Sequence, residues 1–571
     1  MVYNILKVKK EDSENIVGFL NRTTPTAVFA FTDTSIASLL VNALSNDFDY
    51  VLYICGIIVF AFLLFSFGRV EISLMAFLPL FIAWIWILGI MGMTGIRFNI
   101  VNIILATFIF GMGDDYSIFV TEGLLYEHAY GKKMLAQFKN SIILSATIMF
   151  ISIGMLIFAK HPAMRSLAEV TIIGMFSVVL MAYIVPPVVF KWLTIRKGKP
   201  RRQPVTLASL FRSAIGFPYF FGGVLVMSVG SLIWLRIGKR NDTNKLKYHT
   251  LLQKLLYSTA RIIPKSSFTI DNPLGETFEK PAVIISNHQS HFDLMYLLML
   301  HPKIIALTND WAWNTPLYRG IVRNADFLPT SYGLASNFPK IQQMVDKGYS
   351  VLVFPEGTRS FDQSLLRFHQ GAFHLAEKLG LDILPIVTHG IGDMFPKHDT
   401  CIHRGIVTIS IRERIPLDNC DYRNGKSSLE TSRIFRRYFI QEYAALKEKC
   451  EDSEYLKDIV YHNYIYKGKA VENSCRRKLV WVQELVDALE EVPNNARVLY
   501  KHCGNGELSL MTALLRKHID VTAYDADDNS IALASHCFSV PENLHYTSEL
   551  PDESMYDFIL DEQTILQSPT K

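Results

Sequence analysis

Two short motifs carry residue types that could catalyse a reaction. The first, NHQSHFD at residues 287–293, follows the apolar run PAVIIS and precedes the apolar segment FDLMYLLML. We expect a strand that ends just before His288 and a helix that begins near Asp293. A carboxylate so placed can orient one imidazole nitrogen and leave the other free to take a proton, which is general-base chemistry.

The same motif contains a second histidine. His291 precedes Asp293 by only two residues, and on an early helical turn these two side chains would point to different faces. The spacing therefore favours His288 as the base and His291 as a bystander. For this motif taken alone, a polar strand–helix turn with capping residues is the alternative.

The second motif, FPEGTRS at residues 354–360, also follows an apolar strand-like run. Glu356 supplies a carboxylate, Gly357 permits close approach of the backbone, and Thr358 adds a hydroxyl. Arg359 offers a planar fork of donors that suits a phosphate or a carboxylate. The motif therefore predicts a binding loop beside the candidate base.

The two motifs together resemble the glycerolipid acyltransferase family of the lysophosphatidate type, over roughly residues 245–430. The resemblance implies that His288 deprotonates an acceptor hydroxyl and that Asp293 orients it. The hydroxyl would attack the thioester of acyl-CoA or acyl-carrier protein, with no cofactor, metal or covalent enzyme intermediate. The residues implied to bind the acceptor are Glu356, Gly357, Thr358 and Arg359.

The sequence departs from this family at one place. Members that bind glycerol phosphate usually carry an arginine at the end of the segment that here reads PLYRGIVRNADFLPTS, and residues 327–331 of this chain contain no cation. Arg319 or Arg323 could replace it. Both a phosphate-bearing acceptor and another lipid or pigment alcohol therefore remain open.

Elements that would hold these motifs at a membrane lie upstream. Hydrophobic residues make up 50% of the 571 residues and charged residues only 19%. Apolar runs of roughly 20 residues predict membrane spans near 51–67, 72–94, 99–125, 140–160 and 168–192. The net charge of +4 is too small to indicate nucleic acid binding.

Basic residues predict the orientation of these spans. Lysines between the third and fourth spans, and KWLTIRKGKPRR after the fifth, should be cytoplasmic. Residues 1–50 would then lie outside, so either the chain inserts with its N-terminus out or a preceding span is missing; we favour the second. The run at 215–235 has basic residues on both sides and contains Pro218. It therefore favours a re-entrant or interfacial hairpin over an ordinary span.

An acidic pair lies inside the third predicted span, in GMGDDYSIFV at residues 111–120. Carboxylates at membrane depth are costly and usually serve ion or proton movement; a helix end at the interface is the alternative. Gly111 and Gly113 would let helices approach closely. Together with the basic loop and the segments SIILSATIMFISIGMLIF, HPAMRSLAEVTIIGM and YIVPPVVF, this run resembles the last five spans of an RND-type exporter of the MMPL family. The resemblance implies that Asp115 and Tyr116 carry protons, and we expect Asp114 to belong to the same relay.

The C-terminal part, ARVLYKHCGNGELSL followed by HIDVTAYDADD, resembles the start of a class I SAM-dependent methyltransferase. The resemblance implies that Gly504 and Gly506 form the cofactor turn and that Asp525 binds the ribose, with SAM as cofactor. Tyr500 and His502 replace the usual acid and first glycine. A degenerate or truncated domain is the alternative.

The order of these parts resembles the trifunctional fusion proteins of Bacteroidetes-type bacteria. We expect a multidomain protein: a partial RND-type helical bundle, an α/β acyltransferase fold and a partial Rossmann-like domain. The boundaries are an extracytoplasmic segment at 1–50, the five-span domain at 51–200, a membrane-associated hairpin at 205–245, the acyltransferase at 246–450, and the linker with the methyltransferase-like domain at 451–571.

The expected function is acyl transfer to a lipid-like alcohol at a bacterial inner membrane, with the enzymatic domains cytoplasmic. A lipid or pigment-lipid transporter component is the first alternative and a methyltransferase the second. Expected partners are membrane lipids, acyl-CoA or acyl-carrier protein, and either the missing exporter half or further copies of this chain. The seven scattered cysteines, without a C-x-x-C pair, fit a reducing compartment rather than disulfides or a zinc site.

Overall fold

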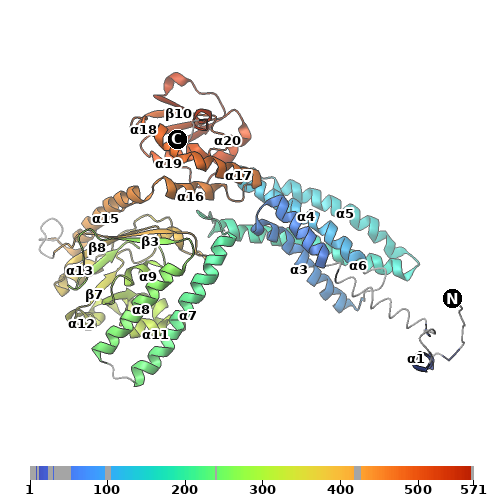
Figure 1. Ribbon diagram of the computed structural model, residues 1–571, viewed down its shortest axis with the longest axis horizontal. Helices are drawn as coiled ribbons and strands as arrows, with labels where there is room; N and C mark the ends of the chain where they lie inside the picture. Colours follow the sequence, from blue (N-terminus) through green and yellow to red (C-terminus); the bar gives the residue numbers. More distant parts are fainter. Residues whose placement is uncertain are drawn as a thin grey trace. The chain divides into compact units, whose positions relative to one another are not determined.

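The computed structural model describes residues 8–9, 12–23, 30, 32, 50, 53–96, 104–237, 241–416 and 426–567. The chain forms two compact units, Met1–Lys191 with Tyr466–Ala470, and Trp192–Ile465 with Val471–Lys571 (Figure 1).

The first unit is built from apolar helices. Apart from α1 (Ser13–Thr23), they are Tyr53–Phe67, α3 (Val70–Thr94), α4 (Ile104–Tyr130), α5 (Leu135–Gly154) with the 3-10 turn η1 (Met155–Phe158), and α6 (Pro162–Thr194). By length and composition, α3, α5 with η1, and α6 could cross a membrane. Residues 1–7 and most of 24–49, within the predicted extracytoplasmic segment, lie outside the described residues.

Helix α4 packs closely against its neighbours at Gly113. A Cβ atom there would lie 2.6 Å from Val178 of α6 and 2.9 Å from Leu80 of α3. A side chain at this position would force the helices apart, so the predicted close approach at Gly113 is confirmed. A Cβ at Gly111, by contrast, would meet nothing within 4 Å.

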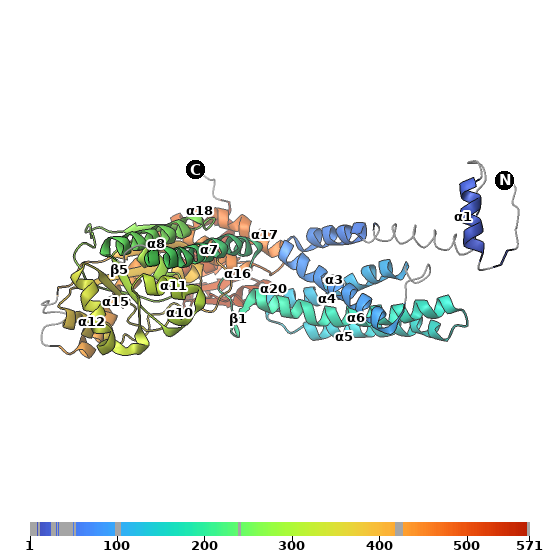
Figure 2. The same cartoon turned by 90° about the horizontal axis from the view of Figure 1, so that it is seen from below.

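The second unit begins with a short hairpin and two long helices. The hairpin pairs β1 (Ile195–Arg196) with β2 (Lys199–Pro200), and α7 (Leu207–Ile237) and α8 (Asp242–Ile262) follow. Helix α7 contacts both α8 and α11 (Pro316–Asn324), and Figure 2 shows these helices side by side.

The hairpin predicted at 215–235 is wrong, because α7 is one continuous helix of 31 residues. Pro218 lies inside it, and Gly223 serves close packing rather than a bend, whereas a Cβ at Gly222 would meet nothing within 4 Å. A Cβ at Gly223 would lie 2.4 Å from Leu255 of α8, and one at Gly320 of α11 would lie 2.7 Å from Ser228 of α7. Part of α7, Leu207–Ser231, is also long and apolar enough to cross a membrane.

A seven-stranded sheet with the order β3-β9-β8-β4-β7-β5-β6 forms the centre of this unit. Among the described pairs of this sheet, β8 and β9 run antiparallel and the others run parallel. The strands are β3 (Ser267–Asp271), β4 (Val283–Ser286), β5 (Ile304–Thr308), β6 (Leu328–Pro329), β7 (Ser350–Val353), β8 (Ile383–His389) and β9 (Ile406–Ile411). The helices between them are α9 (Asp293–Leu298), α10 (Asp310–Asn314), α11, η2 (Thr330–Tyr332), α12 (Gly333–Asp346), α13 (Gly371–Leu379) and α14 (Ile391–Met394).

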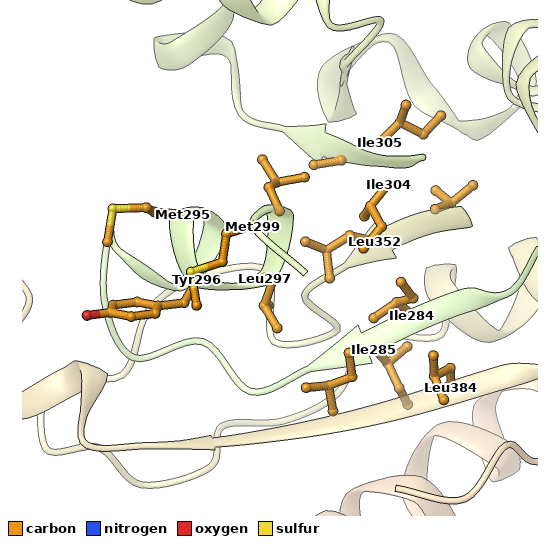
Figure 3. Packing of buried hydrophobic residues seen from close by; sticks show 14 of the residues in the cluster. Ile284, Ile285, Met295, Tyr296, Leu297, Met299, Ile304, Ile305, Leu352 and Leu384 are labelled. Atoms are coloured by element: carbon orange, nitrogen blue, oxygen red, sulfur yellow. The ribbon is translucent and has the colours of Figure 1, made fainter. Parts of the chain in front are cut away.

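The core of the sheet is apolar on both faces, as expected for parallel strands covered by helices. Ile284 and Ile285 of β4 and Leu352 of β7 are fully buried, and Tyr296 of α9 packs in the same cluster (Figure 3). The carboxyl ends of β4, β7 and β8 meet at one edge of the sheet. Both sequence motifs emerge from this edge, where open α/β sheets bind ligands.

The C-terminal part holds a parallel four-stranded sheet with the order β12-β11-β10-β13. The strands are β10 (Arg497–Lys501), β11 (Asp520–Tyr524), β12 (Leu544–Thr547) and β13 (Phe558–Asp561). The helices that precede the sheet are α15 (Ser428–Cys450), α16 (Ser453–Tyr464), α17 (Lys469–Lys478), η3 (Leu479–Trp481) and α18 (Val482–Glu490). Those between and after its strands are α19 (Glu507–Leu515), α20 (Asp528–Ser535), η4 (Glu553–Met555) and α21 (Glu562–Ile565). Numbered along the chain, this order is 3-2-1-4, which is the order of the first four strands of a doubly wound sheet.

Candidate acyl-transfer site

Strand β4 ends at Ser286, and its next residue fixes the start of the catalytic turn. The side-chain amide nitrogen of Asn287 donates to the backbone carbonyl of Thr388 at 2.8 Å, and its side-chain oxygen accepts the backbone N–H of Thr388 at 2.8 Å. Asn287 is fully buried. These bonds join β4 to β8 at the point where the chain leaves the sheet.

His288 and Asp293 form a close pair, as the spacing predicted. Nδ1 of His288 lies 2.8 Å from Oδ2 of Asp293, and Asp293 begins α9. The same carboxylate oxygen accepts the N–H groups of Gln289 at 2.6 Å and Ser290 at 2.8 Å. The aspartate side chain is fully buried, whereas that of His288 is 21% exposed.

An aromatic side chain also packs against the imidazole of His288. The His288 ring stacks on Phe354, with centroids 4.2 Å apart and an interplanar angle of 18°. Because the hydrogen bond to the carboxylate places the proton on Nδ1, the lone pair lies on Nε2, the nitrogen that can act as a base. His291 is exposed, and its ring faces Phe395 with centroids 6.2 Å apart.

Glu356 of the second motif joins the two motifs. Its Oε1 accepts the N–H of His288 and its Oε2 accepts the N–H of Leu366, both at 2.8 Å. A further bond runs from the N–H of Ser360 to the carbonyl of His288 at 3.1 Å. Burial raises the pKa of Glu356 to about 7. Glu356 thus positions the turn of the candidate base, and its role in binding an acceptor stays a prediction.

The remaining residues of the second motif form an open loop. Gly357 has φ +68°, a left-handed conformation, and a Cβ there would lie 3.3 Å from His369. Thr358 is exposed. Arg359 is partly buried, and its Nη1 is buried without a hydrogen-bond partner among the described residues. The role of these residues in binding an acceptor stays a prediction.

A buried polar network behind the turn was not expected from the sequence. The amide of Gln289 donates to the carbonyl of Gln363 at 3.1 Å, and the amide of Gln363 donates to Asp393 at 2.7 Å. Asp393 also pairs with Arg202 at 3.2 Å and accepts from Tyr455 at 2.5 Å. Burial alone would raise the pKa of Asp393, but Arg202 and these hydrogen bonds lower it to about 2. Its members lie far apart in the sequence and form no motif, so the sequence alone did not predict this network.

The arginines that could replace the missing family arginine are placed differently. Arg323 lies over the ring of Trp313, 5.1 Å from its centroid, while Arg319 is exposed. Their proposed substitution for that arginine stays untested.

The predicted acidic pair of α4 is divided between two faces. Asp114 is 8% exposed and its Oδ1 has no partner among the described residues, whereas Asp115 is exposed. Tyr116 is 6% exposed. The structure therefore brings Asp114 and Tyr116, but not Asp115, into the interior of the helical unit.

The glycine turn of the C-terminal sheet is filled by the protein itself. A Cβ at Gly504 would lie 2.9 Å from Nζ of Lys478, and one at Gly506 would lie 2.7 Å from Ala534. Asp525 accepts the N–H of Gly504 at 2.8 Å and that of Asp527 at 3.0 Å, so both of its oxygens serve the local loop. These contacts account for the glycines by local packing, and the expected SAM site stays a prediction.

Comparisons with known proteins concern the part of the chain around the His288–Asp293 pair. Residues 261–389 match the family model described as Acyltransferase. The chain is 30% identical over 185 residues to the chloroplastic 1-acyl-sn-glycerol-3-phosphate acyltransferase LPAT1 of Arabidopsis thaliana, covering 30% of this chain and 50% of that protein. It is 32% identical over 232 residues to a 1-acyl-sn-glycerol-3-phosphate acyltransferase of Chlamydomonas reinhardtii, covering 38% of this chain and 66% of that protein.

Among solved structures, the LPA acyltransferase PlsC of Thermotoga maritima is 21% identical with a TM-score of 0.35, covering 43% of this chain and 97% of that chain. The chain spans between half and two thirds of the length of the two sequence relatives. The matched segment contains both motifs. This chain therefore carries an acyltransferase domain homologous to that of the 1-acyl-sn-glycerol-3-phosphate acyltransferases.

Proposed function

We propose that this protein transfers an acyl group from acyl-CoA or acyl-carrier protein to the hydroxyl of a lysophospholipid or a related lipid alcohol. The observation that carries the proposal is the pair of His288 and Asp293, because Asp293 holds Nδ1 of a partly exposed imidazole and so leaves the lone pair on Nε2. Homology to 1-acyl-sn-glycerol-3-phosphate acyltransferases supports lysophosphatidate as the first acceptor to test.

In the proposed reaction, Nε2 of His288 takes the proton of the acceptor hydroxyl as its oxygen attacks the thioester carbonyl. The C–S bond then breaks, the ester forms, and the proton passes from the imidazolium to the departing thiolate. The buried carboxylate of Asp293 stabilises the imidazolium between these steps. No cofactor is required for this balance.

The reaction takes place at a membrane surface in this proposal. Helix α7 presents large exposed apolar side chains although it packs against α8 and α11, namely Phe211, Leu225, Val226 and Val229. Such a face is stabilised by lipid, and a lipid acceptor could then reach the site from the bilayer. An inner-membrane location with cytoplasmic enzymatic domains remains part of the proposal.

A transporter component is the second proposed function. It rests on Asp114, a buried carboxylate of α4 with one oxygen unpartnered among the described residues. A carboxylate kept in an apolar helical unit is usually retained for ion or proton movement. Asp114→Asn should then block lipid export by intact cells and leave acyl transfer unchanged.

The acyl-transfer proposal is tested with the purified full chain in lipid nanodiscs. Radiolabelled acyl-CoA and acyl-carrier protein are each offered with lysophosphatidate, lysophosphatidylethanolamine and monoacylglycerol, and products are separated by chromatography. Labelled product with at least one acceptor is expected. No labelled lipid from any donor and acceptor pair would contradict the proposal.

A further inference from the structure

The short hairpin of β1 and β2 has an unusual turn. Its two central residues, Lys197 and Gly198, have φ +50° and +80°. Two-residue turns of this kind favour asparagine and glycine, because a longer side chain is strained at positive φ. The strained residue here is an exposed lysine at the tip of the hairpin.

The hairpin is held firmly against the loops of the candidate site. Arg196 lies over the ring of Phe361, 4.7 Å from its centroid, and Lys199 lies 5.3 Å from the same centroid. Phe361 directly follows the FPEGTRS motif. Arg201 pairs with Asp399 at 2.6 Å and Arg196 pairs with it at 3.7 Å, and the three charged side chains are at most 9% exposed. The hairpin is thus a fixed part of the domain.

Two further cations approach from other segments. Nζ of Lys397, in the loop between β8 and β9, donates to the carbonyl of Arg359 at 2.6 Å and lies 3.4 Å from the hydroxyl of Thr358. An ammonium group has three N–H donors, so one remains available to a ligand. Arg359 contributes Nη1, which has no partner within the described part of the chain.

Contacts on both sides of His398 bring these charged segments together, because Lys397 donates to Arg359 and Asp399 pairs with Arg196 and Arg201. Slight burial lowers the pKa of its imidazole, and positive charges from three different segments lower it further: those of Lys197, Lys397, Arg359 and Arg196. Asp399 pairs with Arg196 and Arg201 at the base of the hairpin, and the carboxylate of Asp293 offsets part of the charge of Arg359. The remaining cations repel one another, and an anion placed among them would relieve that repulsion.

We propose that Lys197 of the hairpin and Lys397 of the loop between β8 and β9 add two cations to the anion site already expected at Arg359, and that they bind a phosphate there. This site would take the place of the family arginine that residues 327–331 lack. The ligand is a phosphate ester, supplied either by the headgroup of the acceptor or by the phosphates of the acyl donor. This inference rests on the proposed function, and it adds that one of the two substrates is bound through a phosphate group.

The test uses the full chain in nanodiscs with Lys197→Gln, Lys397→Gln and the double variant. Lys280→Gln is the matched control, because Lys280 is 72% exposed and precedes β4 at the opposite edge of the sheet. KM and kcat are measured with lysophosphatidate and monoacylglycerol as acceptors and with acyl-CoA as donor. Binding of fluorescent lysophosphatidate and of free CoA is measured separately, so that the test does not depend on turnover.

The double variant should raise KM or Kd for one phosphate-bearing ligand by about tenfold or more, as expected for lost charge-assisted contacts. Its kcat, its KM for monoacylglycerol where this is acylated, and its Tm should stay near those of the Lys280→Gln control. A higher KM or Kd for lysophosphatidate alone assigns the site to the acceptor. A higher KM or Kd for CoA compounds alone assigns it to the donor.

Unchanged KM and Kd for both phosphate-bearing ligands in the double variant would overturn the inference while leaving the proposed acyl transfer intact. Absence of acyl transfer in the wild-type protein would instead contradict the proposed function. In that case the two binding measurements still decide whether the phosphate site exists.

Discussion

The backbone N–H of His288 donates to Oε1 of Glu356 across 2.8 Å, which ties the turn after β4 to the loop after β7. The turn that carries the base and the loop that carries the second motif are therefore joined directly by a hydrogen bond. The second oxygen of Glu356 accepts the N–H of Leu366, so the carboxylate is fully engaged inside the protein. This relationship explains why both motifs are needed to hold one imidazole.

Glu356→Gln should flatten the pH dependence of stability. Burial raises the pKa of Glu356 from 4.5 to about 7, so the folded state binds this proton more tightly than the unfolded chain. The resulting stabilisation is fully present below pH 4.5 and is lost as the pH rises through about 7. Between pH 5 and 8 the wild-type protein should lose on the order of 1–3 kcal/mol that the glutamine variant does not. Thermal unfolding at several pH values measures this, and equal slopes in both proteins would contradict the assignment.

Asp293→Asn should lower kcat while leaving the domain folded. Asparagine can keep an oxygen for the N–H groups of Gln289 and Ser290, but it cannot stabilise an imidazolium at His288 with a negative charge. We expect a fall in kcat of about a hundredfold or more, in the range of general-base effects. The assay is acyl transfer to the best acceptor, with circular dichroism to verify folding. Activity within twofold of wild type would remove Asp293 from the mechanism.

Gly223→Ala should destabilise the packing of α7 on α8. The new methyl group would lie 2.4 Å from Leu255, which must move, at a cost of about 1–3 kcal/mol. Gly222→Ala is the matched control, because a Cβ there meets nothing within 4 Å, and alanine in a helix gains about 0.5–1 kcal/mol over glycine. Thermal unfolding should therefore show a lower Tm for Gly223→Ala than for Gly222→Ala. The reverse order would show that the two helices do not pack in this way.

Lys478→Met should destabilise the C-terminal sheet. Nζ of Lys478 lies 2.8 Å from Glu507 and 2.6 Å from Glu562, and both carboxylates are almost fully buried. Losing the cation leaves two buried charges unpaired, which costs about 3–5 kcal/mol. Lys501→Met is the control, because Lys501 pairs with the more exposed Glu553, where an ion pair contributes about 0–1 kcal/mol. Hydrogen exchange of β10 measures the difference, and equal protection in both variants would rule out this role for Lys478.

The sequence predicted the pair at the site because its signal is local. His288 and Asp293 lie five residues apart across one strand–helix turn, so their meeting follows from the motif alone. The position of Asn287 could also have been inferred from the motif, although its partner Thr388 on β8 could not. The contacts of Asp393 with Arg202 and Tyr455 join distant segments, and only the folded structure brings them together.

The wrong prediction at 215–235 has a physical explanation. Pro218 and the glycines of this run are bend formers in isolation, but the run forms one continuous helix that packs against α8 and α11. Tertiary packing thus outweighed local propensity. At the C-terminal turn, Lys478 and Ala534 lie close to Gly504 and Gly506, and the SAM site predicted there stays a prediction.

The central claim is that His288, and not His291, is the base for acyl transfer. Its most direct test compares His288→Ala with His291→Ala in the full chain, measuring kcat for transfer from acyl-CoA to lysophosphatidate at pH 8. The account predicts a loss of about a hundredfold to ten-thousandfold for His288→Ala and a change of less than about threefold for His291→Ala. Full activity in the His288→Ala protein would contradict it.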